Sequence, residues 1–129
     1  MRVSRDEWPI VTLFPRPGGP LEAWREGWAK VEHIVEGTTG AFGLLADARV
    51  SQPPSALERR VVTLFFERQE RILSTRCVGL AVAVSNPMVR AAATAVFWVA
   101  RPPMPVSLEA DAATARSWLD TRLRDVGAA

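Results

Sequence analysis

Residues 78–101 read VGLAVAVSNPMVRAAATAVFWVAR, and this stretch decides the fold. Its first part, Val78–Val84, is a short apolar run, which is typical of a strand covered on both faces of a sheet. Asn86 can accept a hydrogen bond from a free N–H at the start of a helix. Pro87 suits the first helical position, because it has no N–H to leave unpaired. The stretch therefore predicts a buried strand, a sharp turn and an apolar helix.

The predicted helix is apolar nearly all round, since only Arg90 and Thr94 are polar in its interior. A helix of this kind has to be covered on most of its sides. In one interpretation, its alanines simply allow close packing on the sheet. In the other, Phe97, Trp98 or Val99 contacts a second chain, because one side of a helix in so small a protein normally faces water.

Strands and helices alternate on both sides of this stretch. Apolar runs predict strands over residues 8–14, 41–48 and 104–109, with a short extra strand over 1–4. Apolar residues at spacings of three and four predict a helix from 21 to a C-cap at 37, a helix from 56 to about 75, and a last helix after 111. Ser55 and Glu58 have the spacing of a capping box at the start of the second of these helices.

This alternation predicts an α/β fold, with a single mixed sheet of four to five strands and about four helices packed on it. The length of 129 residues is within the usual size of one domain. We expect one domain over residues 1–129, with a core from about 8 to 125.

The charge of the chain is small and dispersed. Sixteen basic and 14 acidic residues leave a net charge of +2, and the arginines are interleaved with acids. Nucleic-acid binding needs a basic face or stripe, and the sequence shows none. We therefore expect no nucleic-acid partner.

The cysteine count and the hydropathy of the chain indicate the cellular compartment of the protein. The single cysteine, Cys77, excludes an internal disulfide, and its place beside the apolar strand predicts a buried, inert thiol. The N-terminus lacks the apolar core of a signal peptide, and the longest unbroken apolar run, residues 95–100, is too short to cross a bilayer. We expect a cytoplasmic protein without membrane insertion.

Polar residues follow two of the predicted strands, at the sheet edge where α/β proteins hold their sites. They are Asp47, Arg49, Ser51, Ser55, Asn86 and Arg90. In one interpretation they form a small binding surface, or Ser51 or Ser55 is phosphorylated. In the other they only fix turns: Ser55 and Asn86 cap helices, and Asp47 pairs with an arginine. Together with Phe97 and Trp98, they make up the candidate interaction surface.

No catalytic signature is visible. The single histidine, His33, is expected on the polar face of the first long helix, away from the strand ends, so neither a nucleophile–base pair nor a metal site with Glu36 is predicted. No G-x-G-x-x-G segment and no phosphate-binding loop follows a strand. We expect no catalytic residue, no cofactor and no metal, and interpret the chain as non-enzymatic.

Three segments carry a resemblance to a known family: GAFGLLADAR, which ends a strand at Asp47, VGLAVAVSNPMVRAAATAVFW, and the closing SLEADAATARSWL. With the long helix between the first two, this order resembles the STAS superfamily, the fold of bacterial anti-sigma factor antagonists, in its divergent SpoIIAA-like branch. The resemblance covers about residues 8 to 125. It implies a STAS-like fold and a bacterial regulatory domain that works through protein partners.

In the antagonists, a serine after the strand that corresponds to Ala41–Ala48 is phosphorylated and switches partner binding. Here the loop reads DARVSQPPSAL and lacks the family's Asp-Ser-Ser/Thr-Gly segment, so Ser51 and Ser55 do not match the motif. A homodimer through the apolar helix is one further alternative. Another is a small-molecule or lipid-binding module, with the helices over 57–73 and 88–99 as the walls of an apolar pocket.

Overall fold

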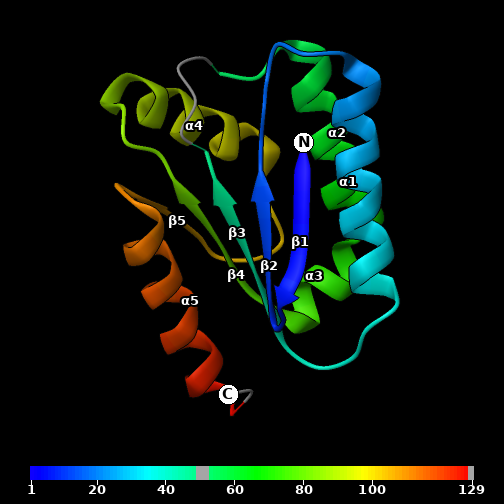
Figure 1. Ribbon diagram of the computed structural model, residues 1–129, viewed down its shortest axis with the longest axis vertical. Coiled ribbons are helices and arrows are strands. Elements are labelled where there is room, and N and C mark those ends of the chain that lie inside the picture. Colours follow the sequence, from blue (N-terminus) through cyan, green and yellow to red (C-terminus); the bar gives the residue numbers. More distant parts are fainter. Residues whose placement is uncertain (49–52, 128–129) are drawn as a thin grey trace.

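The structure is a computed structural model that describes residues 1–48 and 53–127. Within these residues a single five-stranded sheet runs in the order β1-β2-β3-β4-β5, with five helices packed on it (Figure 1). The strands are β1 (Arg2–Glu7), β2 (Ile10–Phe14), β3 (Phe42–Asp47), β4 (Cys77–Ala83) and β5 (Val106–Glu109). β1 is antiparallel to β2, and the other neighbours are parallel. The predicted α/β fold with one mixed sheet is confirmed.

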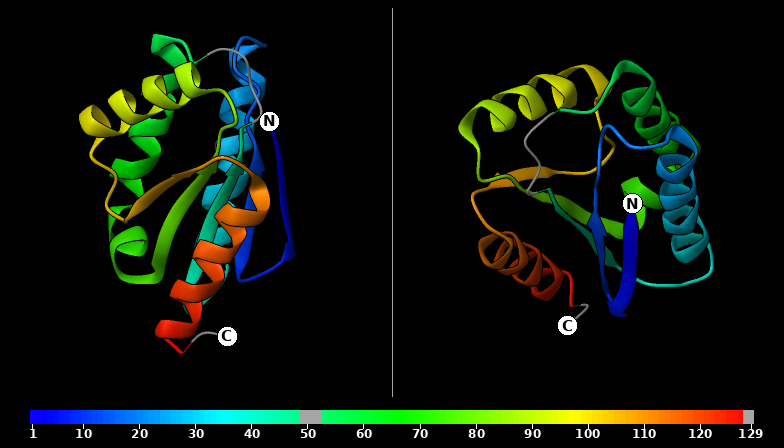
Figure 2. Two further views of the ribbon diagram at one scale, coloured as in Figure 1. Left: turned by 90° about the vertical axis from the view of Figure 1, so that its left-hand side faces the viewer. Right: turned by 45° about the horizontal axis from the view of Figure 1, so that its top comes forward.

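Four helices cover one face of the sheet and one helix covers the other (Figure 1, Figure 2). They are α1 (Leu21–Glu36), α2 (Ala56–Arg68), α3 (Glu70–Arg76), α4 (Pro87–Ala100) and α5 (Ala112–Asp125). From β2 to β5 each crossover moves one position in the same direction, and right-handed crossovers then place their helices on the same face. After the last strand, α5 returns over the opposite face.

β4 is the buried strand that the opening stretch predicts. All seven of its residues are buried, and it pairs with β3 on one side and β5 on the other. Its side chains alternate between the two cores, as strand geometry requires. Leu80 and Val82 join the cluster beneath α1–α4, whereas Ala81 and Ala83 lie in the cluster against α5.

The predicted helix starts are confirmed in atomic detail. The Asn86 side-chain oxygen accepts hydrogen bonds from the N–H groups of Met88, at 2.8 Å, and Val89, at 3.4 Å. Ser55 and Glu58 form a complete capping box at the start of α2. Such contacts involve residues within three positions of one another, which is why the sequence alone predicts them.

The helix predicted from 56 to about 75 is interrupted at Gln69, which separates α2 from α3. Gln69 is 5% exposed, and its side-chain amide donates to the carboxylates of Glu32, at 3.0 Å, and Glu36, at 2.7 Å, both on α1. The prediction of one helix was therefore wrong by a single residue. The buried amide that occupies this position has its partners on another helix.

Two glycines let α5 lie close to the sheet. A Cβ added at Gly79 would lie 2.5 Å from the ring of Trp118, and one at Gly43 would lie 2.9 Å from a methyl group of Leu119. Because a glycine has only a hydrogen atom in place of a side chain, the aromatic and aliphatic side chains of α5 pack directly against the backbone of β4 and β3. The α5 side of the sheet is consequently packed more closely than the α4 side.

Candidate functional site

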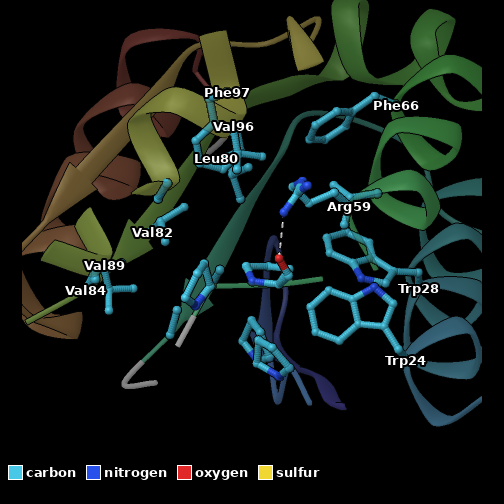
Figure 3. Close-up of a pocket in the computed structure, with 18 residues that line it drawn as sticks. Trp24, Trp28, Arg59, Phe66, Leu80, Val82, Val84, Val89, Val96 and Phe97 are labelled. Atoms are coloured by element: carbon cyan, nitrogen blue, oxygen red, sulfur yellow. Dashed lines mark hydrogen bonds between the residues drawn. The ribbon is translucent and has the colours of Figure 1, made fainter. Parts of the chain in front are cut away.

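An apolar cavity of about 110 Å³ lies at the carboxyl ends of β3 and β4, between α4 and the α1–α2 pair. Figure 3 shows side chains from the two sides facing one another across it, with Trp24, Trp28 and Phe66 opposite Val96 and Phe97. The sheet forms its floor through Ala46, Leu80, Val82 and Val84, and prolines at 15, 17, 53 and 54 complete the lining. This edge of a parallel sheet is where α/β folds bind ligands.

The α1–α2 wall is aromatic. Trp24 and Trp28 are four residues apart, so they lie on the same face of α1, with ring centroids 6.3 Å apart in an edge-to-face arrangement. The Trp24 indole N–H donates to the Glu58 carbonyl oxygen at 3.0 Å, which ties α1 to α2. The Trp28 indole N–H is buried and has no hydrogen-bond partner within the described part of the chain.

The α4 wall is aliphatic and stands further from the sheet. Val89 is buried, and Ala93, Val96 and Phe97 are half-buried along the side of α4 that lines the cavity. Beneath them β4 presents Leu80 and other branched side chains rather than glycine. α4 therefore approaches the sheet less closely than α5 does.

One charged residue is present among the described residues that line the cavity, and it is Arg59. It lies near the start of α2, and its side chain extends toward the space between the two walls (Figure 3). One guanidinium nitrogen, Nη1, donates to the Pro54 carbonyl oxygen at 2.9 Å. The lining surface is apolar throughout, so Arg59 lines the cavity with its aliphatic stem, and its exposed guanidinium adds no polar surface to the walls.

The neighbouring acid, Glu58, is engaged elsewhere. Its carboxylate accepts hydrogen bonds from the N–H of Ser55, at 2.8 Å, and of Gly18, at 3.0 Å. Burial acts to raise the pKa of the Glu58 carboxyl, but these hydrogen bonds outweigh it, and the pKa is lowered. Glu58 is therefore a charged structural group that joins the start of α2 to the loop before α1.

The structure separates the candidate residues predicted at the strand ends. Ser55 and Asn86 cap helices, which agrees with the interpretation that these polar residues only fix turns. Arg90 donates through Nη2 to the Val84 carbonyl oxygen at 3.0 Å, while its buried Nε has no hydrogen-bond partner in the described residues.

Asp47 ends β3 on the opposite side of the sheet, in a polar groove with Thr12 and Arg116. The predicted candidates Arg49 and Ser51 lie outside the described residues.

The two aromatic candidates on α4 face different ways. Phe97 is half-buried, packs against the core and lines the cavity, whereas Trp98 is 79% exposed. Met88 and Val99 share the exposed side, at 82% and 85%. α4 thus has an inner side on the cavity and an apolar outer side in contact with water.

Other chemistry-bearing residues lie apart from the cavity. His33 is exposed on α1, and Cys77 is a buried free thiol. Residues 1–48 and 53–127 contain no group of three or more His, Cys, Asp or Glu side chains placed to hold a metal ion. No helix in these residues is long and apolar enough to cross a membrane.

The sequence placed Trp24 and Trp28 on an apolar helical stripe but did not mark them, or Arg59, as site residues. Their common role depends on where α4 lies, and no local pattern signals that position. Comparison of the chain with protein-family models, with curated proteins and with solved structures finds no match.

Proposed function

We propose that this domain binds a small apolar molecule in the cavity between α4 and the α1–α2 wall. The observation that carries the proposal is the cavity itself: a space of about 110 Å³ with apolar walls at the carboxyl edge of a parallel sheet. Binding sites in proteins are typically concave, mostly apolar and supplied with few polar groups. A dry apolar cavity of roughly 150 Å³ binds benzene. The cavity here is smaller but partly open to solvent, so a single-ring ligand would fill it and extend past its opening.

The test fills the cavity from α4 and uses toluene as the probe. Ala93→Phe places a ring on the inner side of the helix, and Ala91→Phe places the same ring on the exposed side as the matched control. We expect toluene to raise the melting temperature of the wild type and of Ala91→Phe in a concentration-dependent way, but not that of Ala93→Phe. Ala93→Leu is the smaller filler if the phenylalanine variant does not fold. Stabilisation of all variants alike, or of none, would contradict the proposal.

Protein contact through the outer side of α4 is the second candidate function. The observation that favours it is the exposure of three large apolar side chains on α4, Met88, Trp98 and Val99, since exposed apolar surface is typical of interaction sites. This candidate corresponds to the non-enzymatic regulatory role that the STAS resemblance implies, with a second copy of the chain as the first partner to test.

Its test is the solution mass across a concentration series, measured by light scattering. We expect Trp98→Asp to shift the protein toward the monomer without loss of its circular dichroism spectrum, while Ser117→Asp, on the exposed side of α5, leaves the mass unchanged. A wild type that is monomeric at every concentration would remove self-association through α4.

A further inference from the structure

We propose that the ligand of the cavity is a small monocarboxylate: an apolar body about the size of a benzene ring, with a carboxylate bound by Arg59. The inference rests on the proposed function and adds the chemical class of the ligand. An apolar cavity alone would select any molecule of suitable size. The guanidinium of Arg59, exposed beside the apolar lining, would add a preference for an anion.

Arg59 has hydrogen-bond donors to offer. Its guanidinium carries five N–H donors in a planar fork, and the described contacts use Nη1, which donates to the Pro54 carbonyl oxygen. That bond holds the group beside the space between the two walls (Figure 3). Arginine binds carboxylates through paired N–H···O bonds, which neutral acceptors match poorly.

No acid competes for this cation in the described residues. The acid next to it in sequence, Glu58, directs its two oxygens to the N–H groups of Ser55 and Gly18. The ion pairs present among these residues join Arg68 to Glu32 and Arg116 to Glu7, and neither arginine lines the cavity. The positive charge of Arg59 is therefore available to a bound anion.

The exposure of Arg59 determines the orientation of the bound ligand. Because Arg59 is exposed, a carboxylate that reaches it keeps part of its hydration and avoids the large cost of full burial. The apolar body can then occupy the space between the aromatic wall and α4. A single charged end and a compact apolar body are the features that this arrangement recognises.

The test compares two probes with the same ring, phenylacetate and 2-phenylethanol, by isothermal titration calorimetry on the full chain. We expect the wild type to bind the acid about fivefold more tightly than the alcohol, as a partly exposed ion pair allows. Arg59→Gln should abolish this preference, because only the acid loses an ion pair. Arg60→Gln, the matched control, removes the neighbouring exposed charge, which does not line the cavity, and should keep the preference.

Each other result overturns the inference in a recognisable way. Equal affinities for acid and alcohol in the wild type would leave the cavity as a ligand site but remove the carboxylate. A preference that survives Arg59→Gln would remove Arg59. Loss of both affinities in Arg59→Gln would make its role structural. Binding of neither probe to a wild type that toluene stabilises would overturn the carboxylate ligand alone, and absence of stabilisation by toluene as well would overturn the proposed function.

Discussion

The buried thiol of Cys77 makes the stability of the fold sensitive to alkali. Burial raises the pKa of Cys77 to about 12, from an ordinary value of 9.0. The folded state keeps the neutral thiol while the unfolded chain releases its proton, so this stability is fully present below pH 9 and is lost as the pH rises toward 12. The chain has no tyrosine, and Lys30 is its single lysine, so few other side chains titrate in this window.

We expect the free energy of unfolding to fall by roughly 1–3 kcal/mol between about pH 8.5 and 11. Cys77→Ala should be less stable at neutral pH, because it leaves a small void, but should lose much less stability over the same interval. Urea unfolding at a series of pH values measures both slopes. If the variant and the wild type lose stability in parallel, the alkaline sensitivity does not come from this thiol.

Single residues differ in how far the sequence reveals them. Asn86 and Ser55 have their partners within three positions, so their capping roles follow from the local sequence. Trp28 is equally visible as part of an apolar stripe, and its burial was predictable. Its place beside a cavity was not, because that depends on α4, some sixty residues further along the chain. Arg59 shares this dependence, and on a charged helix face it looks like any solvated arginine.

At the scale of elements, the contact between α5 and the sheet depends on the absence of two side chains. We expect Gly79→Ala to destabilise the protein by about 1–3 kcal/mol, because the new methyl group meets the ring of Trp118 and the Pro105 carbonyl. Gly43→Ala should cost less, since it meets the flexible end of Leu119. Urea unfolding of both variants at pH 7 provides the comparison. Equal losses would indicate that α5 shifts as a rigid body instead of repacking locally.

Element boundaries show the same division between local and distant causes. The start of α4 was predicted because its N-cap, Asn86, and its first residue, Pro87, are neighbours in the sequence. The interruption at Gln69 was not, because the two carboxylates that bind its amide belong to α1. Helix periodicity continues across this position, since the Leu73 N–H still donates to the Gln69 carbonyl oxygen. A sequence pattern therefore describes the pair α2 and α3 as one helix.

For the whole molecule, the central consequence is that the two faces of the sheet are packed differently. α5 lies on glycines and closes one core, whereas α4 stands on branched side chains and leaves a cavity beneath it. The α/β class and the sheet follow from the alternation of strands and helices, which the sequence displays along its whole length. The difference between the faces depends on side-chain volumes summed over several elements, and for that reason it became visible only in the folded chain.

This difference should appear as unequal local stability. Amide hydrogen exchange followed by mass spectrometry should show the slowest exchange in β4, all of whose residues are buried, and faster exchange in α4 than in α5. The physical reason is that fewer packed contacts have to break when α4 opens above a cavity. Ala93→Phe, which fills that space, should slow exchange in α4 toward the rate of α5, whereas Ala91→Phe, on the exposed side, should not. If the amides of α4 were already as protected from exchange as those of α5 in the wild type, the cavity would not weaken the packing of α4. A ligand in the cavity would then not be expected to stabilise α4 further.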